Sequence, residues 1–358
     1  MTIVLDDLNY SPKDFLFTKV NIKEENDSAG LASAFLTLWI SGKREFEFNT
    51  SGTTNTPKII LLKRKWMEIS ALQTINRLKL WNENILCCLP THKVGGIMMF
   101  VRALAGDFDI TLFEPRADPM LDLNADHSFT FVSLVPYQLS AIFKSDESTQ
   151  KLNRFRTVLV GGSEINDVLV TQLEALNPTI YHTYGMTETC SHIALKKLNH
   201  GAWPHFIPNE AVELKTDDEG VLAMSGYQTG LEWVQSSDMA RIYKDGSFDI
   251  LGRADFVINS GGFKIIPEQL EKTIADIFNS NNLKTSLAIT SKPHSEWGEE
   301  LILILSGTTF PAKDKIFELL KPRLKAYEVP KQIIFMDEIP LNDGGKTDRR
   351  RLKMMNYK

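Results

Sequence analysis

Residues Phe46–Lys63 read FEFNTSGTTNTPKIILLK, and this stretch decides how the rest of the chain is interpreted. Phe46–Phe48 alternates apolar and charged residues, as a half-buried strand does, and Ile59–Leu62 predicts a second, more buried strand. The loop between them offers backbone N–H groups, hydroxyls and the charge of Lys58, which suit a polyphosphate. It is not a Walker A loop, because no Gly-Lys-Ser/Thr opens a helix after it. An ordinary polar hairpin loop explains the same composition equally well.

The loop resembles the phosphate-binding loop Thr-Ser-Gly-Thr-Thr-Gly-x-Pro-Lys of the adenylate-forming enzymes, the superfamily of acyl-CoA synthetases, luciferases and peptide-synthetase adenylation domains. Asn55 replaces the last glycine, and asparagine is the non-glycine residue that best tolerates a positive φ. The resemblance implies that this loop binds ATP. The residues that it assigns to ATP are Thr50, Ser51, Gly52, Thr53, Thr54 and Lys58.

Composition places the chain among ordinary globular proteins. It has 358 residues, 43% hydrophobic and 24% charged, enough for two domains with their own cores. The net charge of −5 argues against nucleic acid as the main partner, and three cysteines form neither a disulfide framework nor a metal cluster. The acidic start is unlike a signal peptide, and the apolar run Gly95–Gly106, interrupted by Arg102, is too short to cross a bilayer. We expect a cytosolic protein without a membrane span.

Strands and helices alternate from about residue 59 to 182, which predicts βαβ units on a mainly parallel sheet. Short strands with turns follow at 199–230, as in a β-meander. We therefore expect an α/β fold with a large N-terminal domain (1–254), followed by a small, mobile α+β domain (255–358). The resemblance implies that the N-terminal domain is truncated, since relatives carry far more chain ahead of the phosphate loop. A homodimer is one way to complete its core.

Ligands of such sheets bind at the carboxyl ends of the strands, and two glycine-containing segments follow predicted strands. Gly161-Gly162-Ser163 lacks side-chain bulk, so that a flat ring can lie on its backbone, although a tight turn with Ser163 as N-cap is the simpler interpretation. This segment resembles the family's adenine-side Gly-Gly-Ala.

The segment Tyr184–Glu188 resembles the family's Tyr-Gly-x-Thr-Glu, although a polar loop is the alternative interpretation. The resemblance implies that Tyr184 stacks on adenine, that Thr187 binds the α-phosphate and that Glu188 holds Mg²⁺, a cation that prefers oxygen ligands. His182 is expected near the adenine amino group. Gly185 and Met186 belong to the same nucleotide site.

Two later segments complete the resemblance. Asp238 matches the family's aspartate that binds the ribose hydroxyls. In the following Gly252-Arg253-Ala254-Asp255, Arg253 matches an arginine that binds ribose and phosphate oxygens, and Asp255 matches the hinge residue. Lys264, beside the Gly261-Gly262 turn, is assigned to the nucleotide as well. The terminal Gly-Lys-x-x-Arg at 345–349 matches the family's signature, which makes Lys346 the catalytic lysine.

The implied activity is that of an acid–thiol ligase using ATP, Mg²⁺ and coenzyme A on a small carboxylic acid through an acyl-adenylate. Tyr184–Ser191 most resembles o-succinylbenzoate–CoA ligases of menaquinone biosynthesis. Cys190, Ser191 and His192 are expected to line the acyl pocket, with His92 across from them, although a structural histidine at a helix start explains His92 equally well. The alternatives are a ligase for another aryl or fatty acid, an adenylation domain that loads a carrier protein, and a non-catalytic nucleotide-binding relative.

Overall fold

The computed structural model describes residues 1–17, 27–49, 58–165, 167–283, 285–307, 310–342 and 347–357. The chain divides into two compact units. The first contains Met1–Leu214, Ala223–Val234 and Tyr243–Phe248, and the second contains Lys215–Leu222, Gln235–Ile242 and Asp249–Lys358. The boundary that we expected between residues 254 and 255 stays a prediction.

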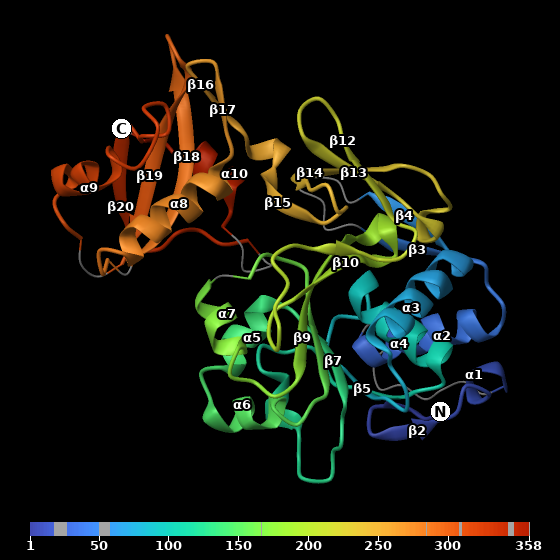
Figure 1. Cartoon of the computed structure of the whole chain (residues 1–358). Helices are drawn as coiled ribbons and strands as arrows, with labels where there is room; N and C mark the ends of the chain where they lie inside the picture. The colour runs from blue at the N-terminus through green and yellow to red at the C-terminus, as the bar shows by residue number, and fades with distance from the viewer. Residues whose placement is uncertain are drawn as a thin grey trace. The chain divides into compact units, whose positions relative to one another are not determined.

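A nine-stranded sheet forms the centre of the first unit, in the order β11-β10-β9-β8-β7-β5-β6-β1-β2 (Figure 1). Its six inner strands, from β9 to β1, pair in parallel, whereas β2, β10 and β11 pair antiparallel at the edges. The strands are β1 (Ile3–Leu5), β2 (Leu8–Tyr10), β5 (Asn84–Cys87), β6 (Asp109–Leu112), β7 (Phe131–Leu134), β8 (Thr157–Val160), β9 (Thr179–Met186), β10 (Ser191–Lys197) and β11 (Ile207–Pro208). The mainly parallel α/β architecture is confirmed.

Helices cover both faces of this sheet, and successive strand residues alternate between the two resulting cores. Ile85 and Cys87 of β5 pack in one core with α2, α3 and α4, whereas Leu86 and the following Cys88 pack in the other with α5, α6 and α7. The helices are α1 (Asp14–Phe17), α2 (Ser28–Ile40), α3 (Arg64–Leu78), α4 (Val94–Gly106), α5 (Pro136–Ile142), α6 (Asp146–Leu152) and α7 (Asp167–Leu173). Strands that are buried on both faces explain the continuous apolar runs of the sequence.

Burial also determines the chemistry of the cysteines. All three are free and buried. Desolvation raises the pKa of the Cys87 and Cys190 thiols to about 12, and that of Cys88 rises too, through desolvation and the neighbouring Cys87. These side chains therefore behave as small hydrophobic groups.

The stretch that opened the sequence analysis forms a hairpin of β3 (Glu45–Asn49) and β4 (Ile59–Lys63), paired antiparallel from Asn49–Ile59 to Glu45–Lys63. Phe46 and Phe48 are buried as predicted. The expectation that β4 is the more buried strand is wrong, because Ile59 is 62% and Leu61 48% exposed. This hairpin is a separate two-stranded sheet, so that the outer face of β4 lies uncovered. Residues Thr50, Ser51, Gly52, Thr53 and Thr54, and Asn55 with them, lie outside the described residues.

The four strands that follow form a meander, because neighbours in sequence are neighbours in the sheet. They are β12 (Glu213–Thr216), β13 (Val221–Ser225), β14 (Val234–Ile242) and β15 (Phe248–Arg253). Short 3₁₀ turns, η1 (Pro119–Asp122), η2 (Thr187–Thr189), η3 (Tyr227–Thr229) and η4 (Ala254–Phe256), complete the connections described in this part of the chain.

The second unit is built on a five-stranded sheet in the order β17-β16-β19-β18, with β20 also paired to β19. Its elements are β16 (Ile258–Ser260), β17 (Phe263–Ile265), α8 (Pro267–Asn279), β18 (Ser286–His294), β19 (Gly298–Ser306), α9 (Lys313–Leu320), β20 (Gln332–Met336) and α10 (Arg349–Met354). Helices α8 and α9 pack on one face, and Leu352 of α10 packs on the other. The predicted α+β character is confirmed. No helix in the described ranges has the length and hydrophobicity to cross a bilayer.

Candidate active site

The predicted adenine-side residues lie just after β8 and within β9. Gly161 allows a close approach, since a Cβ there would lie 2.2 Å from the hydroxyl oxygen of Thr183. The Nε2–H of His182 donates to the carbonyl oxygen of Ser163 at 3.0 Å. Burial lowers the pKa of His182 to about 4, so that the imidazole is neutral near pH 7. His182 thus joins β9 to the 161–163 turn.

Tyr184 belongs to an aromatic cluster at the end of β9. Its ring lies 5.4 Å from that of Phe248 at 75° and 6.0 Å from that of Phe206. We expected Tyr184, Gly185 and Met186 in a turn, but they are strand residues of β9. Gly185 is required there, because a Cβ would lie 2.1 Å from the backbone oxygen of Ser191 on the paired strand.

The motif's last residues form the turn η2. The Thr189 hydroxyl accepts from the N–H of Met186 at 3.0 Å and lies 2.7 Å from the carbonyl oxygen of Ser191. Thr187 and Glu188 are half-buried in this turn. The backbone is strained just after it, since Ser191 has a φ of 93°. The described residues contain no cluster of three metal-ligating side chains, so a Mg²⁺ ion at Glu188 would draw its other ligands from phosphates and water, as this ion usually does.

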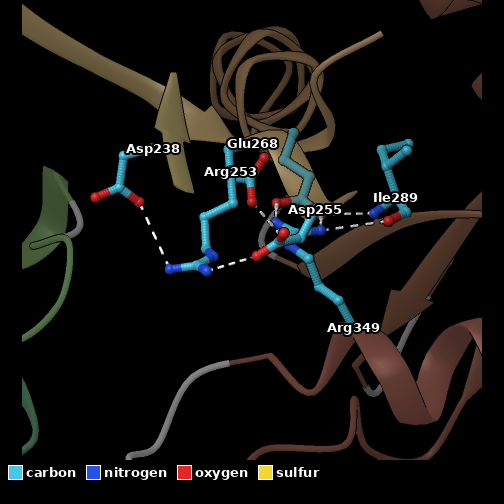
Figure 2. A network of polar contacts seen from close by, with 7 residues as sticks. Asp238, Arg253, Asp255, Glu268, Ile289 and Arg349 are labelled. Carbon is cyan, nitrogen blue, oxygen red and sulfur yellow. Dashed lines mark hydrogen bonds and ion pairs between the residues drawn. The ribbon is translucent and has the colours of Figure 1, made fainter. Parts of the chain in front are cut away.

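In the second unit the structure brings Asp238, Arg253 and Asp255 together (Figure 2). Arg253 donates to the Asp255 carboxylate at 2.6 Å and lies 3.7 Å from that of Asp238. One guanidinium thus links the predicted ribose carboxylate to the predicted hinge. Lys264, in contrast, lies 3.0 Å from the exposed carboxylate of Glu219.

Arg102 is a buried charged residue that the sequence analysis did not include among the candidate site residues. It lies in α4, is 2% exposed, and donates to Ser191 Oγ at 3.1 Å, to Thr74 Oγ1 at 3.3 Å and to His192 Nδ1 at 3.4 Å. All three partners are uncharged. Burial lowers the pKa of Arg102 to about 10, and no ion pair joins it to a carboxylate among the described residues. The one signal in the sequence is an arginine with apolar neighbours on all sides, within Met98–Ala103.

The expected acyl-pocket residues are arranged differently from the prediction. Cys190 has no exposed surface and packs in the core, with its thiol 3.6 Å from the carbonyl oxygen of Gln228. His192 is buried, and desolvation together with the charge of Arg102 lowers its pKa far below the usual value. Cys190 therefore packs in the core, whereas His192 contacts Arg102 and its place in the acyl pocket stays a prediction. Ser191 is half-buried and His92 is exposed in the turn before α4, so both stay candidates.

Lys58, predicted to bind ATP, and Lys346, the predicted catalytic lysine, differ in what the structure describes. Lys58 is described and exposed. Lys346 lies outside the described residues, whereas Arg349, three positions later, is described.

The sequence of this chain is similar to those of known enzymes. The model of the family "AMP-binding enzyme" matches residues 48–244, more than half of the chain. A 2-succinylbenzoate–CoA ligase of Lactococcus lactis is 28% identical over 331 residues, which cover 85% of this chain and 70% of the relative. An indoleacetate–CoA ligase of Aromatoleum aromaticum is 26% identical, covering 83% and 64%.

Solved structures show the same fold. An acyl-CoA synthetase (AMP-forming)/AMP-acid ligase II-like protein of Dyadobacter fermentans is 34% identical with a TM-score of 0.62, covering 92% of this chain and 95% of that one. The o-succinylbenzoate CoA synthetase of Bacillus subtilis, solved with an acyl-adenylate intermediate, is 20% identical with a TM-score of 0.70, covering 87% and 69%.

Proposed function

The chain belongs to the AMP-binding enzyme family, and on that premise we propose that it converts o-succinylbenzoate to its CoA thioester through an acyl-adenylate. In the first step, a carboxylate oxygen attacks the α-phosphorus of ATP and pyrophosphate leaves. In the second, the sulfur of coenzyme A attacks the acyl carbon and AMP leaves. The first barrier is the approach of two anions, so that cations and donors must lie where charge accumulates.

The proposed division of labour follows the residues. The turn 161–163 and Tyr184 bind adenine, with His182 holding the turn. Asp238 and Arg253 bind the ribose. Thr187 binds the α-phosphate, and Glu188 holds Mg²⁺, which neutralises phosphate charge. The hydroxyl loop with Lys58 binds pyrophosphate, and Lys346 bridges the acyl oxygen and the phosphate; a rotation about Asp255 then brings the Gly261-Gly262 turn to the thiol.

The buried charge of Arg102 supports the choice of o-succinylbenzoate as the acid. Among the described residues, the buried Arg102 guanidinium has only neutral partners, and a buried charge is costly unless an anion compensates it. o-Succinylbenzoate has two carboxylates, of which one is activated and the other stays ionised. We assign the ionised carboxylate to Arg102, reached by displacing the hydroxyl of Ser191. A monocarboxylic acid such as indoleacetate supplies no such charge.

A surface of the second unit supports coenzyme A as the acyl acceptor over a carrier protein. The ring of Phe263 stacks on Tyr327 at 4.0 Å and 2°, and the ammonium of Lys331 lies 5.3 Å from the ring centre of Trp297. The Trp297 carbonyl accepts from the N–H of Gly261 at 2.9 Å, so these aromatic rings flank the turn that we assign to the thiol step. Exposed aromatic rings with lysines suit an adenine base carrying phosphates.

The test is pyrophosphate release with a panel of acids, followed by thioester formation with coenzyme A. We expect o-succinylbenzoate to exceed benzoate, indoleacetate and fatty acids. A preference for a monocarboxylic acid contradicts the assignment of Arg102, and ATP binding without turnover on any acid points to a non-catalytic relative. Thioester formation on a carrier protein but not on coenzyme A would replace the second step.

A homodimer and a cytosolic location stay predictions. The exposed outer face of β4, with Ile59 and Leu61, is the apolar surface that supports self-association. Light scattering of the purified chain measures the oligomeric state, and a monomer at micromolar concentration contradicts the dimer.

A further inference from the structure

A buried ionic cluster ties the last helix of the second unit to its first (Figure 2). Arg349, the first residue of α10, is only 11% exposed in its side chain. Its Nε lies 3.0 Å from the Glu268 carboxylate, and its two terminal nitrogens donate to both oxygens of Glu271 at 2.8 and 2.7 Å. The contact with Glu271 is a bidentate pair, which fixes orientation as well as distance.

The cluster also holds a strand. The N–H of Ile289 in β18 donates to Glu271 at 2.6 Å, and Arg349 donates to the Ile289 carbonyl at 3.4 Å. Burial acts to lower the pKa of Arg349, but the hydrogen bonds and charges of Glu271 and Glu268 outweigh it and raise this pKa. The start of α10 is thereby fixed to α8 and β18 at once.

The other end of the cluster reaches the chain just before the predicted hinge. Gly252 has a φ of 151°, and a Cβ there would lie 2.4 Å from a carboxylate oxygen of Glu268. The Glu268 carboxylate therefore lies against the backbone that leads into Arg253 and Asp255. Arg349 itself is held by α8 and β18, and of the cluster's two carboxylates Glu268 is the one that lies against Gly252.

We propose that Arg349 is a positioning residue for Lys346 in the adenylation step. Lys346 precedes it by three residues in the sequence, so a described residue close to the lysine in the chain is fixed by the Arg349–Glu268–Glu271 cluster. This inference rests on the proposed role of Lys346. It predicts that loss of the cluster affects the step that needs the lysine and spares the step that does not.

The experiment compares the two half-reactions in the full-length chain. In Arg349→Met, we expect the turnover number of ATP–pyrophosphate exchange to fall about a hundredfold, because a small misplacement of a catalytic group has effects of that size. The KM for ATP and thioester formation from synthetic acyl-adenylate should stay near their original values. Arg349→Lys, which keeps the charge without the fork, should recover part of the exchange rate.

Arg350→Met is the matched control, since Arg350 is the exposed neighbour on the same helix. It should leave both half-reactions unchanged. If Arg349→Met does not fold, Glu271→Gln removes one charge of the cluster while keeping its shape, and it should show the same selective loss. A purely structural role is indicated, and the inference overturned, if both half-reactions fall by the same factor or if neither falls.

Lys346→Ala separates failure of this inference from failure of the proposed function. If Lys346→Ala retains full exchange, the catalytic role of the lysine is wrong. If it loses exchange while Arg349→Met shows no selective loss, only the positioning role is wrong.

Discussion

Two arginines, one in each unit, meet opposite electrostatic surroundings; Arg102 is 2% exposed, and the side chain of Arg349 is 11% exposed. Arg349 faces two carboxylates, and its pKa is raised. Arg102 faces a serine, a threonine and a histidine, all uncharged, and its pKa falls to about 10. A buried charge that is paired with opposite charges costs little free energy. An unpaired buried charge destabilises the folded state, and an anionic ligand can offset that cost. The comparison therefore separates an arginine that is paired with carboxylates within its unit from one to which we assign a substrate carboxylate.

The largest effect should come from Arg102→Met. We expect kcat/KM for o-succinylbenzoate to fall about a thousandfold, because loss of one partner of a buried charge pair costs several kcal/mol. The melting temperature should stay the same or rise, since an apolar side chain of similar length replaces an uncompensated charge. Steady-state kinetics and calorimetry measure the two quantities. A lower melting temperature with unchanged selectivity between dicarboxylic and monocarboxylic acids would turn Arg102 into a structural residue.

Arg349→Met should change stability in the opposite direction. Removing the guanidinium leaves Glu268 and Glu271 buried without their cation, so we expect the free energy of unfolding to fall by about 3 kcal/mol. Denaturant titration measures it, with Arg350→Met as the control. Equal stability of the two variants would remove the contrast on which the comparison rests.

His182 is a third case, since its imidazole stays neutral near pH 7 and therefore avoids the free-energy cost of burying a charge. Its folded pKa of about 4 lies below its unfolded value, so the unfolded state binds the proton first as pH falls. Stability should be complete above about pH 6.5 and fall by about 3 kcal/mol toward pH 4. His182→Asn should flatten that part of the pH profile in denaturant titrations. An unchanged slope would mean that other groups cause it.

The smallest effect should come from Trp297→Ala on the surface of the second unit. We expect the KM for coenzyme A to rise about tenfold, because a base stacked on an aromatic ring is worth about 1–3 kcal/mol. Pyrophosphate exchange should not change, since coenzyme A takes no part in it. Trp81→Ala, which removes another exposed tryptophan in the first unit, is the control. An equal rise in both variants would argue against the assigned surface.

Much of the fold could be predicted because parallel strands leave a clear pattern. Phe131–Leu134 and Thr157–Val160 are buried on both faces and read as continuous β-prone runs. The same reasoning was wrong for Ile59–Leu62, since an apolar run does not reveal that one face of a two-stranded hairpin is left uncovered. The local sequence pattern indicates the propensity to form a strand. Whether the strand is buried depends on which other segments pack against it.

Candidate site residues could be proposed from the sequence where they belong to a motif. Residues that only tertiary packing brings together could not. Tyr184, Asp238 and Arg253 were assigned from resemblance, and the contact between Arg253 and Asp238 joins the consecutive strands β14 and β15. Arg102 was treated as an interruption of an apolar run, because a single charged residue at a helix position usually points to solvent. Only the three-dimensional arrangement shows that every face of that helix turn is covered.

The adjacent thiols of Cys87, at the end of β5, and Cys88, just after it, bear on the reactivity of an enzyme that uses a thiol cosubstrate. Cys87 and Cys88 project to opposite faces of the sheet, and their raised pKa values leave almost no thiolate. With so little thiolate, these two sulfurs should react slowly with a disulfide or an activated acyl group. Resistance to alkylating reagents under native conditions follows from the same inertness.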